Sequence, residues 1–419
     1  MTVAGPTTIA PATKASPSPN SIRPLEWLNF LVADVQTGVG PFLAAYLAAS
    51  HWNPRDIGFA LTLGGLVTVA AGPFAGGVID RSNSKRTLIA FSLAILAAGA
   101  LVLAFTTKWS GVAPAQVLIG LAGAIIGPAL AAIALGMVGP SSFDRQFGRN
   151  QGFNSAGNVV TALLLAGISY LAGLRSIFFV TAALTIPAFL VLKRINPADI
   201  DNNRARGERP TDGKSAAPES WWRALLTNRT FALFLLCCFL FHLANAAMLP
   251  ELGEMLARGN AKLSAPFMSA CIIVTQLVIA ASASWFGRMA STRGRKPLLL
   301  VGFGVLPIRG VLYTLTHATW ALIGIQLLDG VANAIFVVVS ILVVADLMRS
   351  TGRFNLAQGA LGTVVGLGAS ASNAFGGVLA HRYGFSASFL GLAAVALAAF
   401  LLLWLTIPET KDAAPVPAK

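Results

Sequence analysis

Twelve apolar stretches, each long enough to cross a lipid bilayer as a helix, occupy most of this 419-residue chain. A transmembrane helix needs about 20 consecutive apolar residues. The stretches are unbroken rather than alternating, which excludes a β-barrel. Only 11% of the residues are charged, whereas a soluble domain carries about 25%. The sequence therefore predicts an all-α membrane protein with spans near 25–49, 57–79, 87–107, 113–136, 152–172, 176–192, 230–250, 264–286, 297–316, 319–345, 357–379 and 386–407.

The placement of the basic residues explains the net charge of +14. With the N-terminus on the cytoplasmic side, 23 of the 30 Lys and Arg residues fall in cytoplasmic segments and six on the other side, while Arg309 falls inside a span. Lys and Arg are retained in cytoplasmic loops. We therefore predict a multi-pass protein of a bacterial inner (plasma) membrane with both termini cytoplasmic, with lipid but no nucleic acid as a partner.

Two tails and one long linker divide the chain. Residues 1–24 are rich in Pro, Ser, Thr and Ala and lack the apolar core of a signal peptide, so we expect a disordered cytoplasmic tail. Residues 193–229 carry eight basic and five acidic residues and predict a solvated cytoplasmic linker. This linker separates two six-helix bundles, 25–192 and 230–407, and residues 408–419 form a second cytoplasmic tail.

Three features recur at nearly the same separation. They are GGVIDRSNSKR at 76–86 and GRMASTRGRK at 287–296, which are 211 residues apart; GRNQG at 148–152 and GRFNLAQG at 352–359, which are 207 apart; and Pro41 and Pro250, which are 209 apart. A long internal period of this kind indicates a repeated architecture. We therefore predict that residues 1–195 and 228–410 are parallel halves.

The segment after the second span resembles the signature G-x-x-x-D-R-x-G-R-K/R of the major facilitator superfamily. Gly76, Asp80, Arg81 and Lys85 match the signature, and Asn83 replaces its second glycine. Because Asn tolerates left-handed backbone, we expect Asn83 to keep that turn. The resemblance implies twelve helices in two pseudo-symmetric six-helix bundles, with spans 1, 4, 7 and 10 around a central cavity.

The resemblance also implies a cytoplasmic gate made by Gly76, Asp80, Arg81, Lys85 and Arg353. We expect Asp80 to face the positive N-terminus of the eleventh span and Arg353 in the loop before it. The alternatives are that Asp80 is a solvated loop charge and that Arg81 and Lys85 serve topology alone.

The second copy of the signature has Ser291 and Thr292 where the family would place its acid and base. The two cytoplasmic gates are therefore expected to be unequal.

Three ionisable residues at membrane depth are candidates for proton coupling: Asp34, His242 and Asp329. Such a group costs about 2.5–3.5 kcal/mol on insertion scales, so each needs a partner or a function. Asp34 precedes Pro41 by seven residues and His242 precedes Pro250 by eight, which places them at matching depths in the two halves. The structural alternatives are a carboxylate bonded to a neighbouring helix for Asp34, a packing role for His242, and a buried ion pair between Asp329 and Arg309.

Five polar residues are candidates for substrate binding: Gln36, Gln116, Asn245, Gln326 and Arg309. Gln116 and Gln326 are 210 residues apart, on the fourth and tenth spans, as expected for equivalent cavity positions. Helix packing explains them equally well. Asn245 follows His242 by three residues and therefore shares its helix face.

The sequence contains no nucleotide-binding glycine loop, no metal-ligand cluster and no nucleophile beside a base. We therefore expect no enzyme activity, cofactor or metal, and Cys237, Cys238 and Cys271 are expected to be packing residues. With the resemblance, the sequence predicts a monomeric, proton-coupled secondary transporter of a small neutral, cationic or amphipathic organic solute. Export is favoured over two open alternatives: proton symport of a small metabolite, and a non-transporting membrane sensor.

Overall fold

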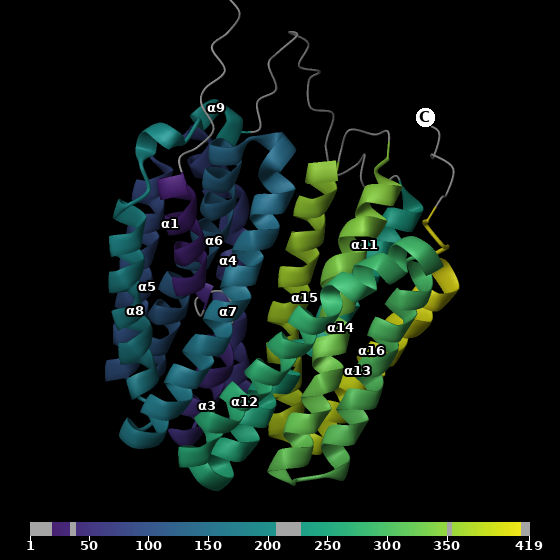
Figure 1. Ribbon diagram of the computed structural model, residues 1–419. Coiled ribbons are helices and arrows are strands. Elements are labelled where there is room, and N and C mark those ends of the chain that lie inside the picture. The colour runs from purple at the N-terminus through teal and green to yellow at the C-terminus, as the bar shows by residue number, and fades with distance from the viewer. Residues whose placement is uncertain (1–18, 34–38, 207–227, 350–353, 412–419) are drawn as a thin grey trace, which may run out of the picture.

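The computed structural model describes residues 19–33, 39–206, 228–349 and 354–411, which are helical and contain no strand (Figure 1). The helices of the first half are α1 (Pro19–Leu31), α3 (Val39–Ala49), α4 (Pro54–Arg81), α5 (Lys85–Phe105), α6 (Trp109–Val138), α7 (Pro140–Ala172) and α8 (Ser176–Lys193). A short connection follows, with η1 (Pro197–Asp199) and α9 (Asn202–Ala205). The second half contains α11 (Arg229–Asn245), α12 (Met248–Arg293), α13 (Lys296–Leu315), α14 (Thr319–Leu347), α15 (Phe354–Tyr383) and α16 (Phe385–Thr406).

If α11 and α12 are counted as one helical stretch, 229–293, ten of the described helices are long and apolar enough to cross a membrane. The stretch 229–293 contains two predicted spans. Within α12 the backbone leaves the helical region at Asn260 (φ −152°, ψ 92°). The part of α12 before Asn260 therefore continues the seventh span, and the part after it forms the eighth. The predicted all-α membrane fold is confirmed.

The seventh span consists of α11 and the first part of α12, and the described residues of the first span lie mainly in α1 and α3. The helices α3 and α12 begin at Val39 and Met248, which are 209 residues apart. Pro41 and Pro250 occupy the third position of these helices. Proline is tolerated there because the first N–H groups of a helix have no acceptor within it. The repeated prolines thus lie in the first turns of α3 and α12.

The two halves form separate bundles that meet at one end of the molecule (Figure 1). We call the end that carries α9 the linker end, and the end that carries the α3–α4 turn, residues 50–53, the far end. At the far end one hydrophobic cluster crosses between the bundles, joining Phe42 and Leu165 of the first half to Met248, Leu252 and Phe389 of the second. The main contacts between the halves are α4 with α15, and α12 with α3 and α7.

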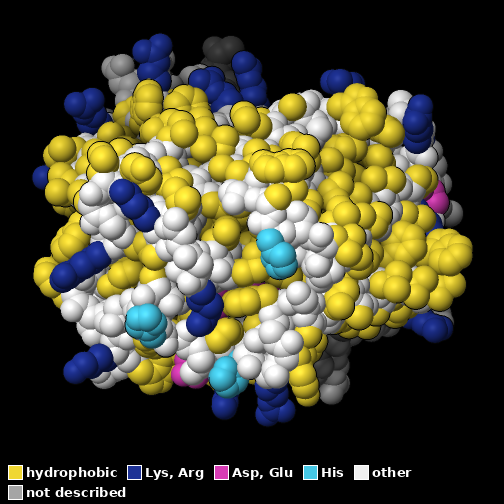
Figure 2. Space-filling view, turned by 90° about the horizontal axis from the view of Figure 1, so that it is seen from below, with side chains coloured by type: hydrophobic (Ala, Val, Ile, Leu, Met, Phe, Trp, Pro, Cys, Tyr) yellow, Lys and Arg dark blue, Asp and Glu magenta, His cyan; other side chains and the backbone are white. Residues whose placement is uncertain are grey.

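The far end is closed by close contacts between the bundles. Thr62 Oγ1 donates to Ser370 O at 2.7 Å, and Arg258 Nη2 donates to Trp52 O at 2.6 Å. A Cβ placed on Gly58 of α4 would overlap the carbonyl of Asn373 on α15. Figure 2 looks onto this end and shows a surface of apolar, polar and basic side chains that extends across both halves.

The bundles separate toward the linker end. A Cβ placed on Gly72, Gly76 or Gly77 of α4 would meet nothing within 4 Å beyond the helix itself, and the same holds for Gly359 and Gly362 of α15. The helices that touch through backbone near Gly58 therefore diverge along their length. Among the described residues, α4 and α15 are therefore in close contact near the far end and apart near the linker end.

Several segments differ from the sequence-based prediction. Residues 19–24, which were expected in the disordered tail, form the beginning of α1. α7 begins at Pro140 rather than near 152, so the motif at 148–152 lies inside a helix. The first part of the predicted solvated linker packs on the first bundle, with Ile195, Ile200 and Ala205 buried. These apolar residues explain the difference, because burying them stabilises an ordered connection.

Candidate functional site

A buried ion pair lies at mid-depth in the second bundle. Arg309 Nη1 of α13 is 2.8 Å from Asp329 Oδ1 of α14, and the Arg309 side chain is only 1% exposed. Burying either charge alone would cost several kcal/mol, so pairing is the expected arrangement. The ion pair predicted from the sequence is present.

Arg309 is the centre of a larger polar network. Its Nη2 donates to Gln326 Oε1 at 2.9 Å, its Nε donates to Tyr313 Oη at 3.0 Å, and its Nη1 also donates to Asn245 Oδ1. Tyr313 Oη donates in turn to Gln326 Oε1 at 2.9 Å. Two of the expected substrate-binding residues, Asn245 and Gln326, are therefore held by Arg309, across α11, α13 and α14.

Asp329 is held by more than the guanidinium. Thr275 Oγ1 of α12 donates to its Oδ2 at 3.2 Å, and Asn333 Nδ2 donates to its Oδ1 at 3.0 Å. Asp329 is therefore held in place from α12, α13 and its own helix α14.

His242 lies on α11, three residues from Asn245, and is half-buried. Its Nδ1 is 3.1 Å from Cys238 O, and its ring meets Phe336 edge-on at 4.6 Å. A carbonyl only accepts, so in the neutral ring Nδ1 carries the hydrogen and Nε2 carries the lone pair. His242 thus has one nitrogen fixed by the backbone and the other available to bind a proton.

The remaining cavity candidates are placed differently. Gln116 of α6 is buried and donates from Nε2 to Ala60 O of α4 at 2.9 Å, the packing arrangement that the sequence left open. Gln326, its partner in the repeat, belongs instead to the Arg309 network. Asp34 and Gln36 lie outside the described residues, between α1 and α3.

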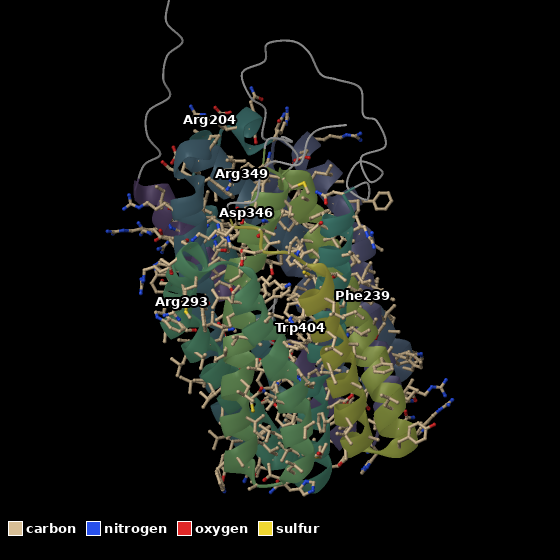
Figure 3. The ribbon with its side chains drawn as sticks, turned by 90° about the vertical axis from the view of Figure 1, so that its right-hand side faces the viewer. Arg204, Phe239, Arg293, Asp346, Arg349 and Trp404 are labelled. Atoms are coloured by element: carbon tan, nitrogen blue, oxygen red, sulfur yellow. The ribbon has the colours of Figure 1, made fainter. Side chains whose placement is uncertain are left out.

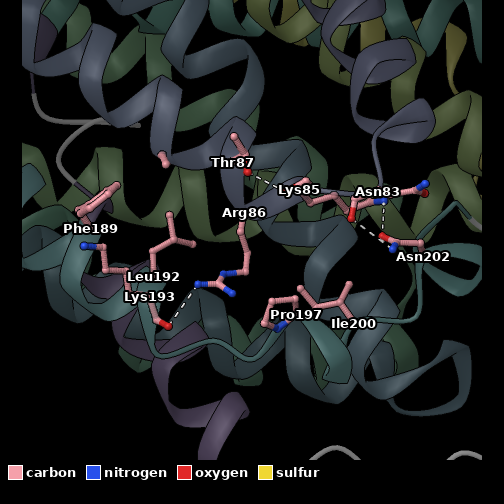
Figure 4. Close-up of a pocket in the computed structure, with 12 residues that line it drawn as sticks. Asn83, Lys85, Arg86, Thr87, Phe189, Leu192, Lys193, Pro197, Ile200 and Asn202 are labelled. Atoms are coloured by element: carbon pink, nitrogen blue, oxygen red, sulfur yellow. Dashed lines mark hydrogen bonds between the residues drawn. The ribbon is translucent and has the colours of Figure 1, made fainter.

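The signature residues lie at the linker end. Asp80 and Arg81 end α4 with exposed side chains, and Arg353 lies outside the described residues. Lys85 is 1% exposed and donates to Ser82 O at 3.1 Å and to Asn202 Oδ1 at 3.3 Å. Figure 4 shows Lys85 beside a pocket of about 310 Å³ between the start of α5 and the residues after α8. Lys85 therefore joins the signature loop to the linker.

The linker also holds the signature loop through Arg206. Arg206 Nε donates to Asp80 O at 2.6 Å, and its Nη2 donates to Asn83 Oδ1 at 2.7 Å. The expected left-handed turn at Asn83 is wrong: Asn83 has no positive φ, whereas Gly294, 211 residues later, has φ +104°. Asn83 instead offers its side chain to Arg206 and its carbonyl to Asn202.

A corresponding clamp fixes the linker end of the second bundle. Asp346 Oδ2 accepts from Arg295 Nε at 2.9 Å and its Oδ1 accepts from Arg349 Nη2 at 3.3 Å; Figure 3 shows Asp346 and Arg349 at this end. Glu409, beyond α16, accepts from the backbone N–H groups of Arg295 and Lys296 at 2.8 and 3.1 Å. Partial burial raises the pKa of Glu409, but these N–H bonds outweigh it and hold the pKa below its usual value.

Sequence reasoning missed two buried acids, Glu251 and Glu254, because the predicted seventh span ended at residue 250. The helix continues beyond Pro250, and both side chains are inside the protein. A signal was present in the sequence, since two acids three residues apart just after a helix-starting proline lie on one helix face.

This arrangement of apolar spans, two repeated bundles and a polar site between helices can be compared with known proteins. The Major Facilitator Superfamily family model matches residues 27–306 and 234–419. The chain belongs to the major facilitator superfamily. The family membership that the signature and the repeat predicted is confirmed, and the protein is an integral, multi-pass MFS transporter.

Relatives and solved structures agree with this assignment. The transporter is 39% identical over 395 residues to MFS-type transporters from two strains of Mycobacterium tuberculosis, which covers 94% of each chain. It is 27% identical over 166 residues to the multidrug resistance protein MdtG of a Rahnella species, which covers 38% of this chain and 40% of MdtG.

Among solved structures, a mutant form of the nucleoside transporter NupG matches with a TM-score of 0.76 at 16% identity, covering 92% of this chain and all of NupG. A POT family transporter matches with a TM-score of 0.72 at 12% identity, covering 92% and 95% of the two chains. At these identities the likeness establishes the fold.

Proposed function

We propose that this MFS transporter exports a small neutral, cationic or amphipathic organic solute in exchange for protons. The observation that carries the solute class is the Arg309–Asp329 pair at 2.8 Å. A guanidinium that is already neutralised and bonded to Asn245, Gln326 and Tyr313 offers little to a polyanion. The amide, hydroxyl and aromatic groups around it suit a neutral or cationic molecule.

The orientation follows from charge. The linker end carries most of the Lys and Arg residues, and the positive-inside rule assigns it to the cytoplasm of an inner (plasma) membrane, with both termini inside. The described conformation is then open to the cytoplasm and closed to the outside. Alternating access would require the contacts near Gly58, Thr62 and Trp52 to open while the linker end closes.

Proton coupling is assigned to Asp34 and His242, which precede the repeated prolines Pro41 and Pro250 by seven and eight residues. Nδ1 of His242 is bonded to Cys238 O, so in the neutral ring Nε2 carries the lone pair that a proton would bind. Asp329 would take part in proton coupling only if the substrate broke its ion pair with Arg309. The stretch of likeness to MdtG, named as a multidrug resistance protein, supports export.

The test is transport by the purified protein in proteoliposomes, with ethidium as a lipophilic cation probe. An imposed pH gradient should drive ethidium against its own gradient in the native protein and in the control Asp56→Asn, which alters an exposed carboxyl at the start of α4. Asp34→Asn should abolish gradient-driven movement but retain ethidium counterflow.

Full gradient-driven transport in Asp34→Asn would remove that residue as the proton site. Movement of solute in the same direction as protons would indicate symport, and absence of counterflow for every solute tried would indicate a sensor on the same fold.

A further inference from the structure

Two acids that the proposed transport cycle does not use are enclosed at the far end. Glu251 and Glu254 lie one turn apart on α12, and each is 2% exposed. Glu251 Oε2 and Glu254 Oε2 are buried without a hydrogen-bond partner. Within the described parts of the chain, neither acid has a Lys, Arg or His nitrogen within 4 Å to form a salt bridge. A carboxyl in such surroundings is stable only in its neutral, protonated form.

The contacts of Ser388 fit a protonated Glu251. Ser388 Oγ of α16 lies 2.8 Å from Glu251 Oε1 and 3.1 Å from Gly376 O of α15. A hydroxyl has one hydrogen and can donate to only one of these oxygens. If Glu251 is protonated at Oε1, it donates to Ser388, which donates to Gly376 O, and both short distances become hydrogen bonds.

The groups around the pair leave it without a counter-ion. Arg258, one turn further along α12, attracts Glu254 electrostatically but forms no ion pair with it, and its guanidinium donates a hydrogen bond to Trp52 O. The ionisable groups on the neighbouring helices have other partners or are exposed. Tyr46 of α3 packs on Phe178, and Tyr170 of α7 packs against Lys262. The residues Arg309, Tyr313 and Asp329 form the central network, and His381 and Arg382 of α15 are exposed. Two acids this close also repel each other when ionised.

The pair lies directly behind the surfaces that close the far end. Gly376 leaves room for Glu251, because a Cβ there would overlap Glu251 Oε1. The next residue, Gly377, packs on Pro54 and Gly58 of the other bundle. The helix that carries the acids also packs along α3 of the first half. Separation of the bundles at this end would therefore admit water to the two carboxyls.

We propose that Glu251 and Glu254 form a proton-binding site that stabilises the closed far end, a role that rests on the proposed proton-coupled function. When the far end opens, water reaches the pair, an O–H bond breaks, and the proton leaves to water while the carboxylate keeps the electron pair. When the far end closes, the carboxylates take protons from the outside solution, one O–H bond forming for each proton taken up. Closure and proton uptake are thus the same step.

The test measures far-end opening against pH without a gradient or a substrate. Spin labels on Arg55→Cys and Arg382→Cys, exposed at the far ends of α4 and α15, report the distance between the halves in lipid nanodiscs. Raising the pH from about 5.5 to about 8.5 should convert closed to open molecules, by up to about tenfold per pH unit for each proton released. The doubly substituted Glu251→Gln, Glu254→Gln protein should stay closed at every pH, and Asp56→Asn should behave as the native protein.

Two results would overturn the proposal: a native distance distribution that does not change with pH, or a double Gln variant that keeps the native pH dependence. If the double variant does not fold, each single Gln variant must reduce the number of protons released, and unchanged numbers would be equally decisive. Because no gradient is applied, this titration stands apart from transport. Proteoliposomes that show no proton-driven transport would refute the proposed function and leave the gate titration to be judged alone.

Discussion

Removing one charge of the buried pair at the centre of the second bundle should destabilise the protein strongly. Asp329→Asn leaves Arg309 buried, and because a guanidinium does not lose its proton, we expect a loss of about 5 kcal/mol, the upper part of the range for such pairs. Arg309→Met leaves a carboxylate that keeps its hydrogen-bond donors Thr275 and Asn333. Its cost should therefore be about 3 kcal/mol, the lower part of that range.

The double variant decides whether the two residues act as a pair. We expect it to be about 2–3 kcal/mol more stable than the sum of the single losses, which is the coupling of residues in one network. Reversible unfolding by SDS in mixed micelles, followed by the fluorescence of the eight Trp residues, measures each free energy. Arg204→Met, which removes an exposed guanidinium 3.7 Å from Asp201, is the control and should cost less than about 1 kcal/mol. Additive losses in the double variant would refute the reasoning.

Three further predictions concern the linker end. Asp80→Asn should shift molecules toward the state open at this end by roughly five-fold to thirty-fold, for a helix-end interaction of about 1–2 kcal/mol, whereas Ser291→Ala should not. Labels on α4 and α15 report this shift as a change in the distance between the halves. Equal distance distributions in Asp80→Asn and the native protein would contradict it. Arg206→Ala should free the linker from Asn83, and protease cleavage near 200–206 should increase. An unchanged cleavage rate would argue against this contact. The pKa of Glu409 is lowered on folding, so the stabilisation by Glu409 is complete above the usual Glu pKa and is lost as the pH falls through the lowered value. Glu409→Gln should remove this loss of thermal stability at acid pH. If the variant lost the same thermal stability at acid pH as the native protein, Glu409 would be excluded as the cause.

The sequence predicted the parts of the fold that depend on transfer into lipid. Hydropathy located the spans that the described residues form, because helices in a bilayer must be apolar over most of their length. The repeated prolines predicted matching features in the two halves, and the structure places Pro41 and Pro250 at the third position of α3 and α12. The Arg309–Asp329 contact followed from the cost of an unpaired charge in the membrane.

The parts that sequence reasoning missed depend on tertiary contacts. Hydropathy ended the seventh span just before Glu251, but a polar residue can continue a helix when other helices enclose it, as Ser388 and Gly376 enclose this one. The conformation of Asn83 depends on Arg206, which is more than a hundred residues away in the chain. The roles of Asp34 and Gln36 remain predictions, because those residues lie outside the described part of the chain.

The central claim is that solute and protons cross the membrane in exchange for one another. The most direct measurement loads proteoliposomes with ethidium and a pH-sensitive dye at equal internal and external pH, and then dilutes them into ethidium-free buffer. We predict that outflow of ethidium through the native protein acidifies the lumen, and that Asp34→Asn still exchanges ethidium without any pH change. Ethidium outflow through the native protein at constant internal pH, or with alkalinisation of the lumen, would contradict proton exchange.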